Sequence, residues 1–587
     1  MRKNIILACC TVVVAAIAVS GCAYKTAQPR TMRGDQPVRF AVIGDRTGGH
    51  EPGIYGQIVN EVERMKPDFV LTVGDMIEGY TDDTVAVKQE WDEYRGLLQP
   101  LTVPVYFTSG NYDIWDSTSL GLYQRIIGNA YYSVDLEGIH FVFLDNSRYY
   151  TVDAFPGEQI EWLVADLERN MGARYTFVFF HIPYWIETIA EDEADTLHSL
   201  FVKYGVDAVF TGHYHSYFSG EFDGIIYTGV GSSGGACSPG PTGLQYHFVW
   251  VTVDSDGIWI APIKMDAVLP WNEVSAAEYK FIERAESEAL HLEKVPVAED
   301  LTVPEREMTV TVRNLNADII LEDTLRWELG EGWTIVPEHM PVEIAPLGSY
   351  TANFTVKNTG IVYPVPTLSL RYPYADGKSC EITDELRPTR TTYAYHADAP
   401  PTIDGTLEED IWMVPTNRLF APDGSAMFTD PVDFYFAWDR NNLYIAAKCV
   451  ETKTDSMVAR VTEHDGAVYG EDCVGYFLQP DVADGPLYQI YFNPLGTPFD
   501  QRITVEEKRA VAADLGWNGE YEVKTLKGEG YWSIEAKIPL AQLGTEGESG
   551  DAWAVNFRRK QRRLNSSSDW QVPITYNPED YGVLLLK

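Results

Sequence analysis

The sequence is poor in basic residues, with 45 Lys and Arg against 86 Asp and Glu among 587 residues and a formal net charge of −41. A surface this acidic repels nucleic-acid phosphates and anionic lipids, so we expect no nucleic-acid partner. Cysteine is scarce as well, with seven residues and no Cys-x-x-Cys pair, which excludes a disulfide scaffold and a Cys-rich structural zinc site. A hydrophobic fraction of 45% excludes wholesale disorder. The length instead predicts about three folded domains.

The N-terminus has the pattern of an export signal. Two basic residues precede an apolar run over 5–19 that is too short for a comfortable membrane span. Residues 19–22, Val-Ser-Gly-Cys, resemble a bacterial lipobox, in which the cysteine carries the lipid after cleavage. We therefore expect residues 1–21 to be a lipoprotein signal peptide, Cys22 to be lipidated and 22–37 to be a tether. The alternative is an ordinary secretory signal in which Cys22 has no role.

Hydrophobic periodicity divides the rest of the chain. Over 38–270, short runs that are apolar on both faces alternate with segments of helical spacing, which predicts an α/β layered domain. We take residues 271–294 as a helical linker. Residues 295–392 alternate with a period of two and predict a small Ig-like β-sandwich, which we interpret as a spacer. Residues 395–587 are strand-rich and aromatic, and they predict a second, larger β-sandwich.

Acidic and imidazole side chains follow the buried strands of the first domain. They lie in the blocks Gly44-Asp45-Arg46-Thr47, Gly74-Asp75-Met76-Ile77-Glu78-Gly79, Gly110-Asn111-Tyr112-Asp113, His181-Ile182-Pro183 and Gly212-His213-Tyr214-His215. A layered α/β fold collects residues that follow its strands at one edge. Mixed Asp, Asn and His ligands suit manganese, iron or zinc rather than calcium. Two such metal ions clamp phosphate oxygens for in-line attack by water, so the blocks predict phosphoester hydrolysis.

These blocks resemble the motifs of the calcineurin-like metallophosphoesterase family, Asp-x-His, Gly-Asp-x-x-Asp/Glu, Gly-Asn-His-Asp/Glu, His and Gly-His-x-His. The resemblance covers about 38–266 and implies a β-sandwich core with flanking helices. It also implies two divalent metal ions that share Asp75. The first would be bound by Asp45, Asp75 and His215, and the second by Asp75, Asn111, His181 and His213.

The sequence departs from the family pattern at the first metal. Thr47 stands where the family has the histidine of Asp-x-His, which leaves three matched ligands. Either His50, three residues further on, or a water would complete the ligand set. His50 can equally be an exposed loop residue that caps the following helix.

A second departure concerns catalysis. Tyr112 replaces the family's histidine that contacts phosphate and assists the leaving group. A phenol with a reference pKa near 10 donates a hydrogen bond but is a poor proton donor at neutral pH, so we expect slower hydrolysis or a need for good leaving groups. Asp113 matches the residue that orients that imidazole. Arg46 is a candidate contact for substrate phosphate, with an exposed loop salt bridge as the alternative. The predicted catalytic residues are therefore Arg46, Asn111, Tyr112 and Asp113.

The last segment resembles the family-9 carbohydrate-binding modules. The resemblance rests on Asp404-Gly405 with Ile411-Trp412, Asn442-Leu443-Tyr444-Ile445, Asp472-Cys473-Val474-Gly475-Tyr476-Phe477, Asn493-Pro494-Leu495-Gly496, Trp532-Ser533-Ile534-Glu535 and Trp553-Ala554-Val555-Asn556-Phe557. It implies a carbohydrate partner held between two aromatic rings. By position Tyr469 and Trp570 would form this clamp. The alternative is that Trp570 packs on a loop and Tyr469 is a surface ring.

Together these features predict an exported metallophosphoesterase, anchored by lipid in a bacterial outer membrane or periplasm and held near glycan. The partners would be a phosphoester substrate and a carbohydrate, with membrane contact only through the anchor. Two other classes of protein stay open. One is a surface glycan-binding lipoprotein whose first domain is catalytically degenerate, and the other is an assembly protein whose domains serve partner contacts.

Overall fold

The structure is a computed structural model that describes residues 36–81, 83–237, 240, 244–264, 266–425, 429–483, 485–506 and 509–587. The predicted signal peptide and Cys22, with nearly all of the predicted tether, lie outside these residues. No helix within the described ranges is long and apolar enough to cross a membrane. The chain divides into two compact units, unit 1 (Met1–Arg284) and unit 2 (Ala285–Lys587).

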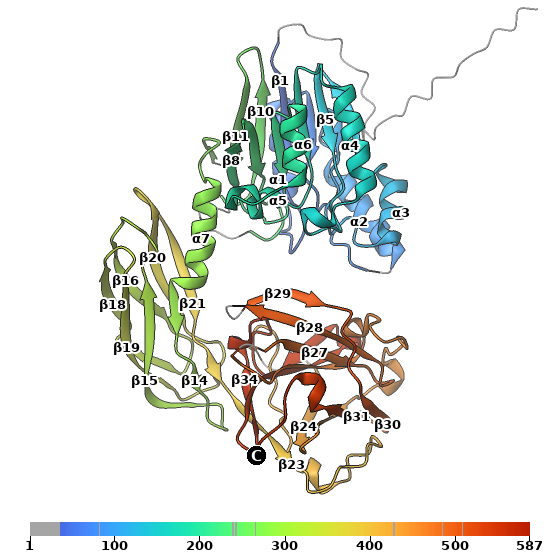
Figure 1. Cartoon of the computed structure of the whole chain (residues 1–587), viewed down its shortest axis with the longest axis vertical. Helices are drawn as coiled ribbons and strands as arrows, with labels where there is room; N and C mark the ends of the chain where they lie inside the picture. Colours follow the sequence, from blue (N-terminus) through green and yellow to red (C-terminus); the bar gives the residue numbers. More distant parts are fainter. Residues whose placement is uncertain are drawn as a thin grey trace, which may run out of the picture. The chain divides into compact units, whose positions relative to one another are not determined.

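Two six-stranded sheets form the centre of unit 1 (Figure 1). Their orders are β12-β11-β10-β1-β2-β3 and β4-β5-β6-β7-β9-β8. The strand bounds are β1 Val38–Ile43, β2 Phe69–Thr72, β3 Val105–Tyr106, β4 Tyr132–Leu136, β5 Ile139–Phe143, β6 Tyr175–Phe179, β7 Ala208–Thr211, β8 Phe218–Phe222, β9 Ile225–Gly229, β10 His247–Val253, β11 Ile258–Lys264 and β12 Ala267–Val268. Strands β1, β2 and β3 run parallel, and so do β5, β6, β7 and β9.

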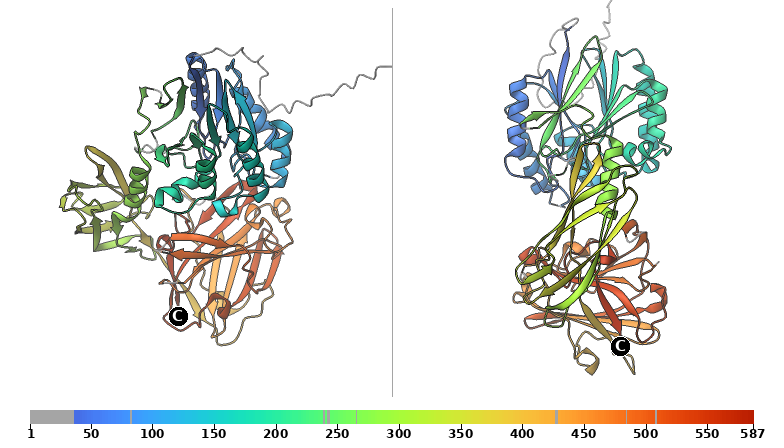
Figure 2. Two further views of the ribbon diagram at one scale, coloured as in Figure 1. Left: turned by 45° about the horizontal axis from the view of Figure 1, so that its top comes forward. Right: turned by 90° about the vertical axis from the view of Figure 1, so that its left-hand side faces the viewer.

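Alternation along the strands explains how the layers pack. In β1, Phe40 and Val42 face the core between the sheets, whereas Ala41 and Ile43 face the helices. Helices cover the outer face of each sheet, as the right-hand view of Figure 2 shows. They are α1 Ile54–Met65, α2 Thr84–Leu97 and α3 Ser117–Ile126 on the first sheet, and α4 Gly157–Arg169, α5 Tyr184–Glu187 and α6 Thr196–Tyr204 on the second. The predicted layered α/β fold with a two-sheet core is confirmed.

The segment expected to be a helical linker is only partly helical. Helix α7 spans Ala276–Glu288, and the next residues form β13 (Leu290–Leu292), which pairs with β15. Leu290 and Leu292 are buried while His291 is exposed, an alternation that favours a strand. The start of α7 is packed, because the Tyr279 ring stacks on Phe218 at a centroid distance of 4.5 Å. The expectation of a helix to residue 294 is therefore wrong.

Unit 2 begins with the predicted small β-sandwich, made of two four-stranded sheets. Their orders are β13-β15-β19-β17 and β18-β16-β20-β21. The bounds are β14 Val295–Pro296, β15 Val303–Arg313, β16 Leu321–Glu328, β17 Trp333–Val336, β18 His339–Ile344, β19 Ser349–Asn358, β20 Thr367–Ala375, β21 Lys378–Glu385 and β22 Pro388–Thr389, with β14 and β22 paired separately. Met308, Val310 and Val312 are buried along β15, as the period of two predicts.

The remaining strands form the larger β-sandwich. They follow the order β29-β28-β27-β26-β32-β34-β23-β24-β25-β31-β30, with β33 on β32. The bounds are β23 Thr391–His396, β24 Val432–Trp438, β25 Asn442–Val450, β26 Cys473–Gln479, β27 Leu487–Phe492, β28 Pro498–Glu506, β29 Arg509–Asp514, β30 Glu522–Gly528, β31 Tyr531–Pro539, β32 Ala552–Gln561, β33 Ser566–Asp569 and β34 Gly582–Leu586. Trp532 and Trp553 lie in its core.

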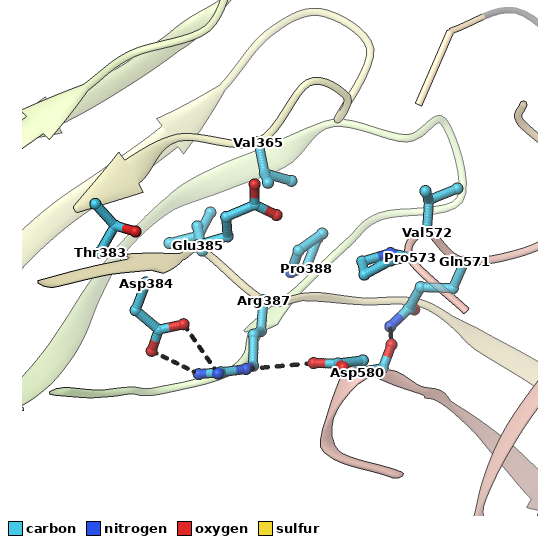
Figure 3. Close-up of a pocket in the computed structure, with 11 residues that line it drawn as sticks. Val365, Thr383, Asp384, Glu385, Arg387, Pro388, Gln571, Val572, Pro573 and Asp580 are labelled. Carbon is cyan, nitrogen blue, oxygen red and sulfur yellow. Dashed lines mark hydrogen bonds and ion pairs between the residues drawn. The ribbon is translucent and has the colours of Figure 1, made fainter. Parts of the chain in front are cut away.

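A cavity of about 240 Å³ lies in unit 2 between the end of β21 and the loops at 571–580. Its only arginine among the described lining residues, Arg387, contacts Asp384 at 2.9 Å and Asp580 at 3.5 Å (Figure 3). Because two carboxylates neutralise this guanidinium, the cavity offers little attraction for an anion. The contacts instead connect the small sandwich to the larger one.

Candidate metal centre

The loops that follow β1, β2, β3, β6 and β7 bring the predicted ligands together at one edge of the two sheets. The side chains form two groups, and within each group the potential ligand atoms all lie within 4.8 Å of one another. One group contains Asp45, Asp75 and His215, and the other contains Asp75, His181 and His213. Asp75 belongs to both. The structure thus brings these side chains together, and Asp75 is common to both groups.

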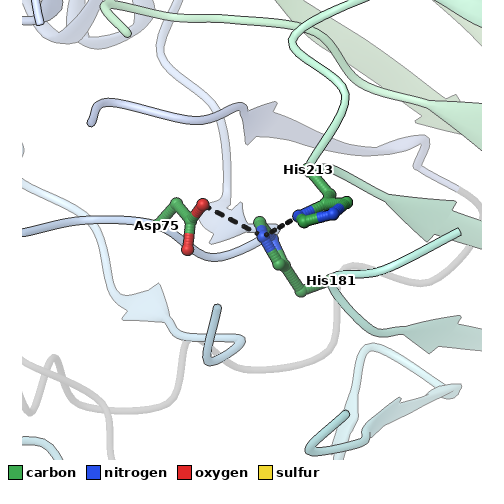
Figure 4. Close-up of side chains that lie close together, drawn as sticks. All are labelled: Asp75, His181 and His213. Atoms are coloured by element: carbon green, nitrogen blue, oxygen red, sulfur yellow. Dashed lines mark hydrogen bonds and ion pairs between the residues drawn. The ribbon is translucent and has the colours of Figure 1, made fainter. Parts of the chain in front are cut away.

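Asn111 completes the second group. Its Oδ1 atom lies 3.0 Å from Nε2 of His181 and 2.9 Å from Nδ1 of His213. In Figure 4, Asp75 and His213 approach the same ring of His181, whose Nε2 is 3.1 Å from Oδ2 of Asp75 and 3.3 Å from Nδ1 of His213. Oxygen and nitrogen donors therefore converge on a small volume.

Backbone carbonyls orient two of the imidazoles. Nδ1 of His181 hydrogen-bonds to the carbonyl of Val73 at 2.8 Å, and Nδ1 of His215 to the carbonyl of Ala236 at 2.6 Å. A carbonyl only accepts, so each Nδ1 carries a proton, and in the neutral imidazole the lone pair is then on Nε2. This arrangement is typical of metal-binding histidines.

The backbone is held in an unusual conformation at the ligands. Asp75, His213 and His215 have φ values of 56°, 77° and 54°, in the left-handed region that non-glycine residues rarely occupy. At Gly110 a Cβ atom would lie 2.1 Å from Oδ1 of Asp75, so only glycine allows this approach. Strain of this kind persists where the surrounding structure enforces it, as at functional sites.

The charges of the site fit bound cations. Oδ2 of Asp45 is buried and has no hydrogen-bond partner among the described residues. Burial raises the pKa of Asp45 to about 6. For His181, burial lowers the pKa, but the carboxylates of Asp75 and Asp45 outweigh it and raise the pKa to about 9. Two carboxylates, one amide oxygen and three imidazoles form a donor set that suits manganese, iron or zinc.

Tyr112 borders the cavity above these ligands. The cavity measures about 540 Å³ and is lined by Gly48, Asp75, Asn111, Tyr112, His213, Tyr214, His215, Ser216, Ala236 and Cys237. The backbone N–H of Tyr112 donates to Oδ1 of Asp75 at 2.9 Å, which places the ring beside the bridging position. Burial and the Asp75 carboxylate raise the pKa of Tyr112. The phenol therefore keeps its proton at neutral pH and is available as a hydrogen-bond donor.

Arg46 does not face the cavity, contrary to the prediction that it contacts substrate. Its guanidinium is buried on the other side of the loop, where it donates to the carbonyl of Met76 at 3.0 Å and to Glu93 at 2.7 Å. The backbone N–H of Arg46 donates to the carbonyl of Asp75. Arg46 thus braces the two ligand loops. The alternative of a salt bridge holds, but the guanidinium is buried rather than exposed.

Asp113 also acts through the backbone. Its carboxylate accepts from the N–H groups of Asp75, Met76 and Gly110 at 2.8–2.9 Å. We expected Asp113 to orient an imidazole, but the neighbouring side chain is Tyr112. Asp113 instead fixes the loops that carry Asp75 and Asn111.

His50 lies outside both ligand groups. Its Nδ1 atom is 2.6 Å from Oε1 of Glu78, and both side chains are more than a third exposed. Burial raises the pKa of Glu78, but its polar neighbours Thr47 and His50 outweigh burial and lower the pKa. The described protein ligands of the first group thus remain Asp45, Asp75 and His215.

Tyr80 is a site residue that sequence reasoning missed. Its hydroxyl accepts a 3.1 Å hydrogen bond from Nδ2 of Asn111, and its ring meets that of Tyr112 edge-on at 5.0 Å. Its only signal in the sequence is weak, an aromatic residue two positions after Glu78.

The predicted sugar clamp is wrong in one of its two rings. Trp570 is 1% exposed and stacks on Phe557 at 4.8 Å, while the Arg390 guanidinium lies 4.9 Å above its ring. Both faces of the indole are therefore covered. Tyr469 is 48% exposed and packs edge-on against Phe499, so it is the surface ring of the pair.

The domain has a two-sheet core between helical layers and two groups of potential metal ligands that share one aspartate. These features define the class of metal-dependent phosphoester hydrolases. Residues 38–217 match the calcineurin-like phosphoesterase family, so this part of the chain belongs to that family. Human serine/threonine-protein phosphatase CPPED1 is 29% identical over 210 residues, which are 32% of this chain and 66% of that protein. Arabidopsis thaliana purple acid phosphatase 18 is 29% identical over 204 residues, 31% of this chain and 44% of that protein.

These alignments show that the chain spans less than two thirds of the length of the curated relatives it matches. Among solved structures, a dimetal phosphatase from Danio rerio is similar at 13% identity and a TM-score of 0.31, covering 40% of this chain and 99% of its own. A family-9 carbohydrate-binding module from Caldicellulosiruptor kristjanssonii is similar at 18% identity and a TM-score of 0.25, covering 34% of this chain and 93% of its own.

Proposed function

We propose that this protein is an exported, lipid-anchored phosphoesterase that uses two divalent metal ions and is held near glycan by its C-terminal β-sandwich. The observation that carries the proposal is the sharing of Asp75 between two groups of ligand atoms. A shared carboxylate holds two metal ions close enough to act on one phosphoryl group.

We assign the side chains of the site two roles, metal binding and hydrogen bonding to the substrate. Asp45, Asp75 and His215 would hold the first metal ion, and Asp75, Asn111, His181 and His213 the second. When bound, the pair of ions activates water and offsets charge on the phosphoryl oxygens. Tyr112, protonated at neutral pH, donates a hydrogen bond to a phosphate oxygen or to the departing oxygen. A hydrogen bond assists departure less than a full proton transfer does, so esters with good leaving groups are the favoured substrates.

Export and glycan binding rest on other features. The basic and apolar N-terminal pattern with Cys22 supports a lipid anchor, and such an anchor would hold the mature protein in the bacterial cell envelope, at the outer membrane or in the periplasm. The exposed ring of Tyr469 in the second sandwich supports contact with a sugar face. The glycan would concentrate the enzyme near its phosphoester.

The test is manganese-dependent hydrolysis of nitrophenyl phosphate mono- and diesters by the mature protein. Asp75→Ala serves as the inactive control, and metal content is measured in both proteins. Activity that disappears in Asp75→Ala supports the phosphoesterase. A metal-loaded protein that hydrolyses neither ester would refute it.

A catalytically degenerate glycan-binding lipoprotein is the second candidate. It is favoured by Thr47 and Tyr112, which replace two histidines of the family motif. The expected signature is bound metal without hydrolysis, together with glycan affinity that falls in Tyr469→Ala. Hydrolysis by the metal-loaded protein would exclude this candidate.

A further inference from the structure

Three tyrosines from separate loops lie beside the metal centre, and one of them, Tyr112, lines its cavity. Tyr80 follows β2, Tyr112 follows β3 and Tyr150 follows β5. Tyr80 and Tyr150 are 52% and 57% exposed, so large ring surfaces face solvent beside a polar site. We refer to Tyr80, Tyr112 and Tyr150 as the tyrosine rim. Exposed aromatic surface next to a ligand cavity is typical of binding sites.

Contacts to the ligands hold the rim in place. The hydroxyl of Tyr80 accepts from Asn111, and the rings of Tyr80 and Tyr112 meet edge-on. The ring centroid of Tyr150 lies 6.2 Å from that of His213, another member of the second ligand group. Tyr80 thus contacts Asn111 and Tyr150 lies beside His213, two residues of the second ligand group.

The backbone of Tyr80 has a conformation that is unfavourable for a bulky residue. Its φ of 48° is in the left-handed region, which bulky residues rarely adopt. The adjacent Gly79, at φ 56°, leaves no room for a Cβ atom, which would lie 2.0 Å from the carbonyl of Tyr112. The loop thus turns sharply to direct a ring toward the site, a conformation that needs support from its surroundings.

The cavity offers no cation for a second phosphate. None of its described lining residues is Lys or Arg. The two arginines beside the ligand loops are engaged elsewhere, Arg46 with Glu93 and Arg148 with Asp145 at 3.3 Å. Polyphosphates, which need additional positive charge, are poorly matched to such walls.

We infer that the tyrosine rim is the leaving-group subsite and selects phosphoesters in which an uncharged ring, either aryl or sugar, is attached next to the phosphoryl group. This inference rests on the proposed phosphoesterase function and adds the class of substrate. Ring faces stack on tyrosine, and the phenol hydroxyls offer hydrogen bonds at the ring edge.

Binding of two non-hydrolysable ligands to the metal-loaded protein tests the rim without turnover. Phenylphosphonate carries a ring and methylphosphonate does not, and calorimetry gives the affinity of each. We expect phenylphosphonate to bind about 5- to 10-fold more tightly, the range of one aromatic contact. Tyr150→Ala should remove most of this preference and leave methylphosphonate binding unchanged, while Tyr150→Phe keeps the preference.

A matched control is Trp259→Ala, because Trp259 is 59% exposed on β11 at the end of the sheet away from the ligands. It should change neither affinity. The inference would be overturned if the wild type bound both ligands with equal affinity, or if Tyr150→Ala lost the same affinity for both. Tighter binding of pyrophosphate than of phenylphosphonate would overturn it as well. If neither phosphonate binds the metal-loaded protein, the phosphoesterase proposal fails and the rim with it.

Aryl and sugar rings are then separated by kinetics. Phenyl phosphate and glucose 1-phosphate are compared as substrates of the wild type and of Tyr150→Ala. The ring that the rim accepts is the one whose KM rises in the variant while glycerol 2-phosphate, which has no ring, is unaffected. Unchanged KM values for both ring substrates would contradict the inference.

Discussion

The amide nitrogen of Asn111 donates to the hydroxyl of Tyr80, and this contact determines which end of the Asn111 side chain faces His181 and His213. The two ends of a carboxamide have nearly the same shape, but only the oxygen has lone pairs for a metal ion. A hydroxyl that accepts from the nitrogen therefore turns the oxygen toward the imidazoles. Tyr80 is a positioning residue for the second ligand group.

Tyr80→Phe should lower metal affinity about tenfold, the usual cost of removing a group that orients a ligand. Titration calorimetry with manganese measures it. Tyr214→Phe is the control, because the Tyr214 hydroxyl donates to Glu187 and not to a ligand. The same metal affinity in wild type and Tyr80→Phe would show that Asn111 needs no such support.

Asp75→Ala should abolish hydrolysis of nitrophenyl phosphate and lower metal content, because both ligand groups lose an oxygen. Asp223→Ala, which removes a carboxylate at the opposite end of the second sheet, should leave both quantities unchanged. Metal content is measured by atomic emission on dialysed protein. Residual activity close to that of Asp223→Ala would argue against a shared carboxylate.

Tyr112→His should raise turnover on esters with poor leaving groups by about 10²-fold, the lower end of the gain from general acid catalysis. An imidazolium transfers a proton near neutral pH, whereas the pKa of Tyr112 is raised by burial. The comparison is kcat for alkyl and nitrophenyl phosphates in wild type, Tyr112→His and Tyr112→Phe. Indistinguishable rates in all three proteins would remove Tyr112 from the mechanism.

A buried histidine away from the metal centre predicts how stability depends on pH. His140 is 1% exposed and bonds Asp135 at 2.8 Å and Asp166 at 2.9 Å. Burial lowers its pKa, but these two carboxylates outweigh burial and raise it above the usual 6.5. The protonated form is favoured by folding, so the stabilisation is complete below about pH 6.5 and is lost as pH rises through the folded-state pKa.

Unit 1 should therefore melt at lower temperature as pH increases from 6 to 9, followed by calorimetry. His140→Gln should have a lower melting temperature at pH 6 and a weaker dependence on pH. A variant that loses the same number of degrees at every pH would show that the histidine contributes no proton-linked stability.

The two rings of the predicted sugar clamp should behave differently. Trp570→Ala removes a buried indole from the core of the larger sandwich and should cost about 3–5 kcal/mol in the free energy of unfolding of unit 2. Tyr469→Ala should change that free energy by less than about 0.5 kcal/mol, because the side chain is half exposed. Urea denaturation gives both values. A large loss in Tyr469→Ala would show that the ring is structural.

Glycan retention on an affinity gel separates binding from folding in the same pair of variants. We expect Tyr469→Ala to elute earlier than the wild type although it is folded. Unchanged retention would mean that Tyr469 does not contact the glycan.

Much of the site could be predicted because its ligands follow strands directly. Asp45 and His213 come two residues after β1 and β7, where the strand itself fixes their position. Residues that depend on the path of a loop were harder. Arg46 is next to Asp45 in the sequence, yet its side chain leaves the other face of the loop and reaches Glu93.

Aromatic residues were the least predictable. Trp570 lies in the polar sequence Ser-Asp-Trp-Gln, which favours an exposed position, but Arg390 and Phe557 enclose it from distant segments. Tyr80 was missed for the opposite reason, since no local pattern tells where a loop will direct a ring. Tertiary contacts decide the burial of Trp570 and the direction of the Tyr80 ring.

The strand order of the larger sandwich has a consequence for how the protein is made. Strand β34 lies between β32 and β23, and it pairs Val583–Leu586 in parallel with Thr391–Ala394. This part of the sheet cannot form until β34 has left the ribosome. The strand that pairs with β23 is synthesised about 190 residues after it. Until then β23 and β32 each present an unpaired edge that invites aggregation, so the larger sandwich is protected only once β34 has been made.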